Sequence, residues 1–286
     1  MRKVHVDRTG KMVGLSYFGR RVVREMNRIG MIVDLSHSSL WTMQHALEES
    51  TAPVIFSHSG AQGVCNSSRN VPDDILRLLA LNEGIVMVPF YPPFVSCSSA
   101  ATIRDVIRHM NHIRRVVGVD HIGIGSDFDG IDLVPSGLED VSKYPHLLAE
   151  LLAEPGWTEE DVKKVAGLNF LRVFKKVEQV SLKFSAAHKT GRTADSAHGP
   201  RRPLELHLPR GLSWTGGNWN KHFASRPSTS TSTSTSSTMT DSQAPRTRNN
   251  ALAYTGVDRK TRIFREIFRS LTSAVRRRRA FPGLKQ

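Results

Sequence analysis

The sequence predicts an α/β protein with a parallel sheet over its first 180 residues or so. Helical and strand-like segments alternate in this part of the chain, and the strand-like segments are unbroken apolar runs. A strand that is apolar throughout is buried on both faces, which is typical of parallel sheets covered by helices. Each apolar run also ends in polar residues, at the sheet edge where β/α proteins carry their chemistry.

Helix signals are strong in the first segment, where Phe18, Val22, Met26 and Ile29 share one helical face and Gly30 follows as a stop. Later helical segments begin with Ser, Thr, Pro or Asp, and several end at Gly, as helix termini usually do. Helices are therefore expected over residues 18–30, 38–50, 71–84, 101–118, 142–156 and 157–180.

Four strands are expected, and each is followed by polar side chains. The carboxyl ends of neighbouring parallel strands lie side by side, so His37 and His58 should converge on one point. A lone His at a strand end is usually a hydrogen-bonding loop residue, and that alternative stays open. Two at equivalent positions, with Asp127 after a later strand, favour a zinc site with a carboxylate beside it. The strands are expected over residues 31–35, 52–59, 84–93 and 121–129.

The remaining histidines of this part lie on predicted helices or at their ends. A His in such a place is more often a solvated or packing residue than a ligand. This interpretation covers His45, His109, His112, His121 and His146.

Charge divides the chain into two regions. The whole chain has a formal net charge of +14, yet residues 1–180 hold 20 Lys and Arg against 21 Asp and Glu. Residues 181–286 hold 20 against 5 and include a long Ser/Thr tract, a composition typical of disorder. We therefore expect a folded domain over residues 1–180 and a basic, disordered tail over residues 181–286.

Part of the tail, residues 258–279, has the pattern of a basic amphipathic helix. A solvated tail is the simplest interpretation, and binding to an acidic surface, either nucleic acid or anionic lipid, is the alternative. The chain shows no specific nucleic-acid module. It also shows no signal peptide, transmembrane segment or lipid-anchor signal, so its localisation stays unknown. The two cysteines, Cys65 and Cys97, are either free buried thiols or a pair.

Five segments in order resemble the membrane (renal) dipeptidase family of zinc peptidases, which belongs to the amidohydrolase superfamily. The resemblance covers about residues 14–180 and implies a TIM barrel. The segments are "GLSYFGRRVVREMNRIGMIVDLSHSS", "APVIFSHSGAQGVCNSSRNVPDD", "MVPFYPPFVSC", "IGIGSDFDGIDLVPSGLEDVSKYP" and "GLNFLRVF".

The resemblance implies a role for individual residues. His37 and His58 match two ligands of one of the family's two zinc ions, and Asp127 matches the aspartate that handles the proton of the attacking water. Arg69 matches the arginine that holds the substrate, and Tyr91 falls where the family lines its pocket. Cys65 and Cys97 match a pair that forms a disulfide in surface-exposed animal members. The family cleaves dipeptides broadly, accepts a D-residue at the C-terminal position, and is usually dimeric.

The resemblance also implies that part of the family's site is missing. A His-x-Asp motif, a glutamate that bridges both metals and a further substrate-binding histidine all precede the matching region, and only 13 residues precede Gly14. We therefore expect the last four of eight β/α units, hence a truncated zinc-dependent dipeptidase. The alternative is a non-catalytic relic of this fold whose basic tail binds polyanions or an acidic membrane surface.

Overall fold

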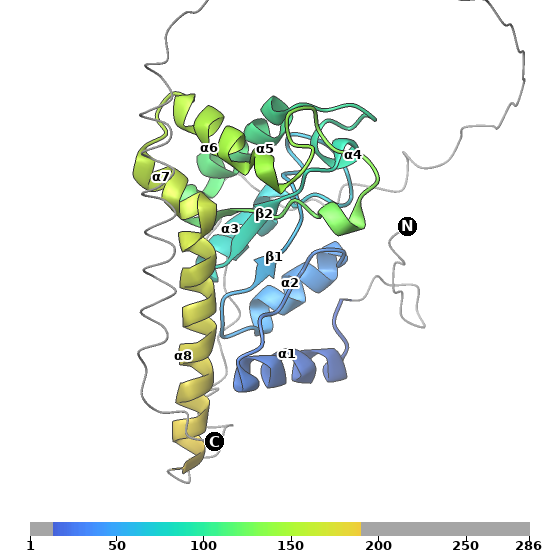
Figure 1. Ribbon diagram of the computed structural model, residues 1–286. Coiled ribbons are helices and arrows are strands. Elements are labelled where there is room, and N and C mark those ends of the chain that lie inside the picture. Colours follow the sequence, from blue (N-terminus) through green and yellow to red (C-terminus); the bar gives the residue numbers. More distant parts are fainter. Residues whose placement is uncertain (1–13, 190–286) are drawn as a thin grey trace, which may run out of the picture. The chain divides into compact units, whose positions relative to one another are not determined.

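A parallel sheet lies at the centre of the structure, a computed structural model that describes residues 14–189 (Figure 1). Its strands are β1 (Ile55–Phe56), β2 (Ile85–Val88) and β3 (Ile122–Ile124), in that order. Ile55 pairs with Ile85, and Val86 pairs with Ile122. The predicted α/β class with a parallel sheet is confirmed. Residues 181–189 of the expected tail belong to the last described helix and are ordered, contrary to the prediction. Residues 190–286, with the Ser/Thr tract and the expected basic helix, lie outside the described residues.

The segment over residues 31–35, predicted as a full strand, forms only one bridge. Asp34 pairs in parallel with Ile55, and two backbone hydrogen bonds flank the bridge: Leu35 donates to Ile55, and Ile55 donates to Val33. The run stops there because the carboxylate of Asp34 accepts the backbone N–H of Ser36 at 3.0 Å and turns the chain. The segment thus lies beside β1 as expected, but it is shorter than predicted.

Helices alternate with the strands, and their caps agree with the sequence. Ser39 accepts the backbone N–H of Thr42 at the start of α2, and Thr102 and Asp105 form a capping box on α5. A short helix, α4 (Pro92–Val95), follows β2 and was not predicted. The longer helices are α1 (Tyr17–Ile29), α2 (Leu40–Glu49), α3 (Asp73–Leu81), α5 (Ile103–Val117) and α6 (Tyr144–Ala153).

The last predicted helix, residues 157–180, is interrupted and longer than expected. It consists of α7 (Glu159–Lys163), a π-helical turn (Lys164–Leu168) and α8 (Asn169–Lys189). Gly167 breaks the regular helix with a φ of 161°, a backbone angle that no helix interior has. The expected domain boundary at residue 180 falls inside α8.

The apolar face predicted for the first helix is largely exposed. The side chains of Phe18 and Ile29 are 74% and 49% exposed. α1 instead buries Val23 and Asn27. Asn27 faces inward because its side-chain oxygen accepts the backbone N–H of Thr51 at 2.7 Å, which fixes the turn before β1.

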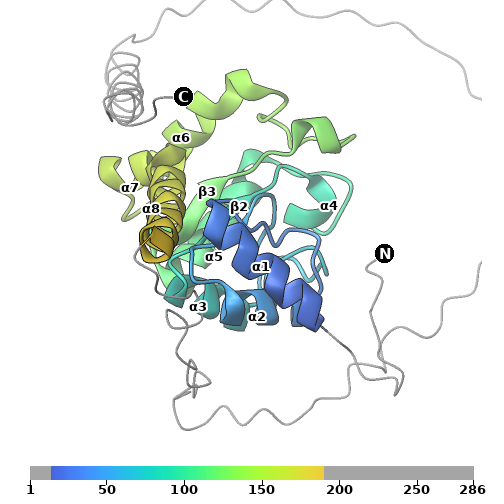
Figure 2. The ribbon, with the colours of Figure 1, turned by 90° about the horizontal axis from the view of Figure 1, so that it is seen from below.

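The main core lies between the sheet and the helices that follow each strand. Seen from below, α2 and α3 lie side by side and α8 lies on another side of the strands (Figure 2). A second, smaller core joins Ile55 and Ile85 to Val173 and Val177 of α8. The largest fully buried side chains are Phe56, Phe90, Met43, Leu76, Leu79, Ile85, Ile107, Met110, Ile113, Ile122, Leu138 and Leu147.

Helix α8 crosses the amino ends of the strands, opposite the edge where the polar residues gather. The amide of Asn169 donates to the carbonyls of Val119 and Ile122 at 2.8 and 2.9 Å. The guanidinium of Arg172 donates to the carbonyls of Glu83 and Asp120 at 2.6 and 2.8 Å. These bonds hold the starts of β2 and β3 together and leave the carboxyl edge free for a site.

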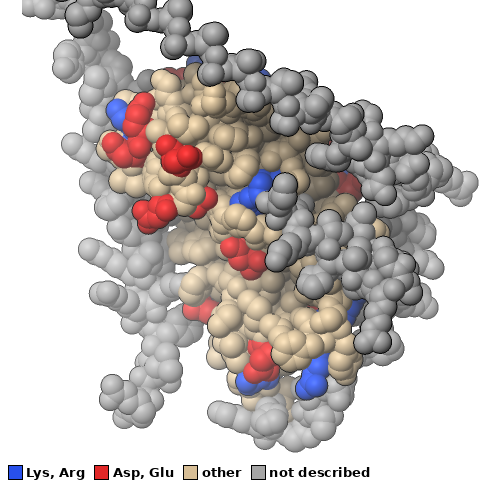
Figure 3. Space-filling view, turned by 90° about the vertical axis from the view of Figure 1, so that its right-hand side faces the viewer, with Lys and Arg blue, Asp and Glu red and all other residues tan. Residues whose placement is uncertain are grey.

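The surface of the described residues carries charges of both signs. On the face shown in Figure 3, acidic and basic side chains lie beside each other in places, and uncharged surface separates these clusters. This agrees with the near-zero net charge of residues 1–180. Within residues 14–189, no helix has the length and apolar character needed to cross a membrane.

Candidate metal and substrate site

The two histidines predicted to converge do so. His37 follows the bridged segment, and His58 follows β1. Their Nε2 atoms lie 2.8 Å apart, with the ring centroids at 4.9 Å. Parallel pairing of the two segments brings these side chains together at the carboxyl edge, as the sequence indicated.

Arg69 and Asp127 complete the group around the two imidazoles. The Nη2 of Arg69 lies 3.0 Å from the Nε2 of His37. Since a guanidinium can only donate, this contact requires a lone pair on the His37 nitrogen. The Oδ2 of Asp127, after β3, lies 3.9 Å from the Nε2 of His58. The Nη1 of Arg69 is buried with no hydrogen-bond partner in the described residues, so it is available to an anionic ligand.

Tyr91 joins this group indirectly, through Phe94. The Arg69 guanidinium lies 5.2 Å from the centre of the Phe94 ring, and the Tyr91 ring meets the same ring edge-on at 4.8 Å. A hydrogen bond with Asp132 is the main cause that raises the pKa of Tyr91. Tyr91 therefore lies at the edge of the group and supports the position of Arg69.

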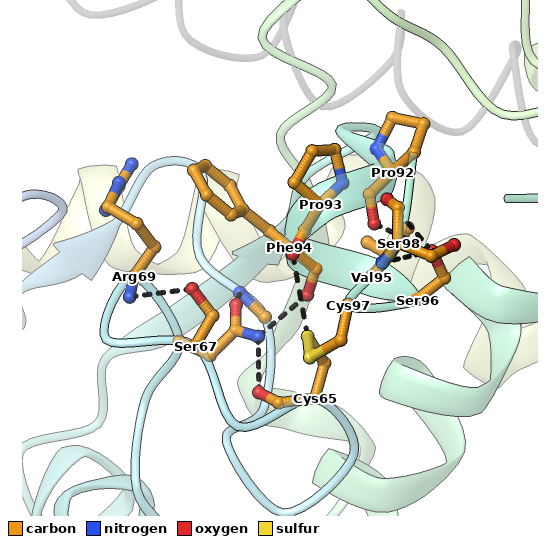
Figure 4. The surroundings of a disulfide bond; sticks show 12 residues. Cys65, Ser67, Arg69, Pro92, Pro93, Phe94, Val95, Ser96, Cys97 and Ser98 are labelled. Carbon is orange, nitrogen blue, oxygen red and sulfur yellow. Dashed lines mark hydrogen bonds between the residues drawn. A yellow bond between two sulfur atoms is a disulfide. The ribbon is translucent and has the colours of Figure 1, made fainter. Parts of the chain in front are cut away.

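A disulfide connects the two loops that carry Arg69 and Tyr91. Cys65 and Cys97 are bonded, with their Cα atoms 5.5 Å apart (Figure 4). Beside the bond, the amide of Asn70 donates to the carbonyls of Cys65 and Phe94 at 2.9 and 2.7 Å. The loop after β1 is thus fastened to the segment after β2, and the alternative of two free thiols does not apply.

The backbone of the group is strained at two candidate residues. His37 has a φ of 65° and Asp127 a φ of 66°, in the left-handed region that non-glycine residues seldom adopt. Each such residue costs about 1–3 kcal/mol and is commonly found at functional sites. The strain turns both side chains toward the same point.

The environment of His37 favours its neutral form. Burial is the first cause that lowers its pKa, and the positive charges of Arg69 and His58 act in the same direction. A neutral imidazole is the form that binds a metal ion.

Comparison with known proteins identifies the family to which this chain belongs. Residues 1–188 match the membrane dipeptidase family (peptidase family M19). The chain belongs to the membrane dipeptidase family. This confirms the resemblance found in the sequence.

Two curated relatives in this family share 54% identity with the chain. One is dipeptidase 3 of Rattus norvegicus, over 167 residues that make up 58% of this chain and 34% of the relative. The other is an uncharacterized dipeptidase of Schizosaccharomyces pombe, over 175 residues, 60% of this chain and 42% of the relative. The chain therefore spans less than half the length of either relative.

A solved metallopeptidase of Rhodobacter sphaeroides resembles the chain in structure, with a TM-score of 0.55 and 33% identity. The match covers 58% of this chain and 48% of the metallopeptidase. That protein was crystallised with a phosphinate mimic of the dipeptide L-Ala-D-Ala. Because the family consists of metallopeptidases, the next question is whether the side chains of this site could bind a metal ion.

The two imidazoles of this dipeptidase-family chain fit two ligands of one zinc ion. Zinc–nitrogen bonds of about 2.0–2.1 Å at a tetrahedral angle place two nitrogens about 3.3 Å apart. The observed 2.8 Å would need to widen by only a small amount. Within residues 14–189, however, no group of three His, Cys, Asp or Glu side chains is arranged to hold a metal. The described residues thus offer two nitrogen donors to a metal ion, fewer than a complete site needs.

Sequence reasoning missed the residues that contact the Nδ1 side of His58, opposite the nitrogen that faces His37. The Oδ1 of Asp34 accepts the backbone N–H groups of Ser36 and Ser57, both at 3.0 Å. The Oδ2 of Asp34 lies 2.5 Å from the Oγ of Ser57, which lies 2.7 Å from the Nδ1 of His58. The repeated Ser-His after both strands was the only signal, because Asp34 lies within an apolar run.

Proposed function

We propose that this chain contributes to a zinc-dependent dipeptidase, in which it supplies the carboxyl-edge residues of the last β/α units of a TIM barrel. The convergence of the His37 and His58 Nε2 atoms, with Arg69 and Asp127 beside them, carries this proposal. When bound, zinc supplies a Lewis acid that polarises a peptide carbonyl and lowers the pKa of water.

The chain's own residues divide the remaining work. His37 and His58 would hold the ion through Nε2. Arg69 binds the free carboxylate of the dipeptide, for which its forked donors and its unpartnered, buried Nη1 are suited. Asp127 takes a proton from the attacking water and returns it to the leaving amine, which is general acid–base catalysis. Tyr91 borders the substrate pocket.

The preferred substrate class is a dipeptide with a free C-terminal carboxylate, including those that end in a D-residue. The ligand of the Rhodobacter sphaeroides relative, a mimic of L-Ala-D-Ala, supports this class. A complete two-zinc site requires further ligands, which we place in chain segments beyond this sequence. The short share of each relative that the chain covers supports this truncation.

Hydrolysis of L-Ala-D-Ala tests the function. We expect the native protein to release alanine, to lose activity with a chelator and to regain it with Zn²⁺. His58→Gln should abolish the metal response, whereas Gln44→Ala, a change on α2 that removes only an exposed hydrogen bond to Glu48, should not. Hydrolysis that is unaffected by chelation would contradict the proposal.

Intact mass and peptide mapping of the native protein test the truncation separately. Peptides upstream of Met1 would support a longer working enzyme. A native protein that begins at Met1 and hydrolyses dipeptides as the 286-residue chain would contradict the proposed truncation. Homodimer formation, and binding of acidic surfaces by the tail in a non-catalytic relic, remain proposals outside the described residues.

A further inference from the structure

We propose that Asp34 and Ser57 form a positioning relay that fixes the proton of His58 on Nδ1 and so keeps its Nε2 free to bind metal. The relay consists of three side chains in line: the Asp34 carboxylate, the Ser57 hydroxyl and the His58 ring. It rests on the proposed role of His58 as a metal ligand. It deepens that role by naming the residues that prepare the ligand.

The direction of the two hydrogen bonds follows from the donors available. Ser57 has one hydroxyl proton, and an ionised carboxylate such as Asp34 can only accept. The short Oγ–Oδ2 distance of 2.5 Å therefore commits this proton to Asp34. The Ser57 oxygen must then accept from His58, so its 2.7 Å partner Nδ1 carries the ring proton.

Backbone contacts hold the relay in one orientation. The other carboxylate oxygen of Asp34 accepts two backbone N–H groups, from Ser36 and Ser57. The carboxylate therefore cannot rotate without losing both bonds. The backbone N–H of His58 donates to the Ser36 hydroxyl at 3.0 Å, which fixes the residue independently of its ring. The ring thus has one tautomer and one direction, as outer partners of metal-binding histidines usually ensure.

Arg69 likewise keeps a lone pair on the Nε2 of the second imidazole, that of His37. Its guanidinium donates to the Nε2 of His37, so this nitrogen carries a lone pair. The two Nε2 atoms lie at hydrogen-bond distance, 2.8 Å, so a lone pair on each nitrogen requires a proton or a metal ion between them. The relay therefore makes the pair a cation-binding unit rather than a neutral hydrogen bond.

Asp34→Asn gives the sharpest test, because it reverses the direction of both hydrogen bonds in the relay and keeps all three side chains in contact. The Asn oxygen must keep the two backbone N–H groups, so its NH₂ group faces Ser57 and donates. Ser57 then donates to Nδ1 of His58, and the ring proton moves to Nε2. Long-range ¹H–¹⁵N NMR of the full chain with chelator, at a pH of about 8.5 where imidazoles are neutral, reads the tautomer directly. The His58 signals are identified by their loss in His58→Gln.

The wild-type chain should show protonated Nδ1, Asp34→Asn protonated Nε2, and Ser57→Ala a mixture. Ser57→Thr, which keeps the hydroxyl, should restore the wild-type tautomer, and Ser36→Ala should leave it unchanged. Zn²⁺ affinity by calorimetry should fall roughly 10–100-fold in Asp34→Asn. If Asp34→Asn does not fold, the Ser57 variants decide.

A wild-type His58 protonated on Nε2, or a tautomer that is the same in wild type, Asp34→Asn and Ser57→Ala, would overturn the relay. The tautomer is read without metal or substrate. A native protein that hydrolyses no dipeptide therefore refutes the proposed function alone. An active chain whose tautomer ignores Asp34 and Ser57 refutes the relay alone.

Discussion

Gly125 lies so close to Ser57 that a Cβ atom at residue 125 would overlap the Ser57 carbonyl oxygen. The two residues follow β3 and β1, which are separated in the sheet by β2. Their contact brings the loops after these strands together at the carboxyl edge. A methyl group placed there must push back the backbone next to His58.

Gly125→Ala should therefore disturb His37 and His58, the pair proposed to bind zinc. Overpacking against backbone costs about 1–3 kcal/mol of folding free energy, and we expect Zn²⁺ affinity to fall at least about tenfold, as when a supporting residue is lost. Urea unfolding and zinc calorimetry measure the two effects. Gly19→Ala is the matched control. It lies in α1, and the atoms nearest to its Cβ would be side-chain atoms of Leu15 and Ser16, none closer than 3.2 Å, so it should unfold no more easily than wild type. Equal zinc affinity in Gly125→Ala and wild type would contradict the expectation.

In the active protein, Arg69→Lys should raise KM for dipeptides roughly 10–100-fold. This is the loss of affinity expected when one hydrogen bond to a charged group is removed. Lysine keeps the charge but loses the fork and the contact with Phe94. A dipeptide amide serves as the control substrate, because it lacks the carboxylate. The variant should lose most of the wild-type preference for the free acid over the amide. An unchanged preference would assign carboxylate binding to another residue.

His109 should make the fold sensitive to acid. It is fully buried on α5, and burial is the first cause that lowers its pKa from 6.5 to about 4. The unfolded chain therefore binds the proton more readily, and stability is lost as pH falls from about 6.5 to about 4. The loss is about 3 kcal/mol for a shift of this size. Urea unfolding at several pH values across this window measures it.

The matched variant is His109→Gln. The Nδ1 of His109 accepts the backbone N–H of Ala61 at 2.8 Å, and its Nε2 donates to the Val95 carbonyl at 3.0 Å. A glutamine has one acceptor and one donor for the same partners but does not titrate. It should flatten the pH dependence, whatever its stability at neutral pH. An equally steep dependence in this variant would place the titrating group elsewhere.

Reduction of the disulfide should weaken the fold and the substrate loops together. The bond closes a loop with a sequence separation of 32, for which the chain-entropy estimate is about 3–4 kcal/mol. Unfolding with and without reductant measures this difference. The double variant Cys65→Ala/Cys97→Ala should match the reduced protein and ignore reductant. A wild-type protein whose stability is also indifferent to reductant would show that the bond does not form in solution.

Much of the fold followed from patterns that act locally. Apolar runs located β1, β2 and β3, and cap residues such as Ser39 and Thr158 located helix starts. The first strand was overestimated because its end depends on a side chain, Asp34, that turns the backbone back on itself. The break at Gly167 was missed because its apolar pattern continues through the turn.

The sequence was enough to predict which residues form the candidate site. It was not enough to predict how their backbone and side chains are arranged. Strand-end polarity and the family resemblance identified His37, His58, Arg69, Asp127 and Tyr91, and the structure brings the first four together. The left-handed backbone of His37 and Asp127 carries no sequence signal, because neither is a glycine. The part played by Asp34 arises only when two separate segments pair, so single-segment reasoning could not find it.

The hydrogen bonds from α8 to the starts of β2 and β3 form late in synthesis, because α8 is the last described helix to leave the ribosome. Asn169 and Arg172 lie in α8, the last described helix, and Ser181 of the same helix donates to the carbonyl of Arg28 near the beginning. During synthesis, His37, His58, Arg69 and Asp127 leave the ribosome before any of the residues that make these hydrogen bonds from α8. A product that stops or is cut before Asn169 would contain every one of those four side chains without the support beneath them.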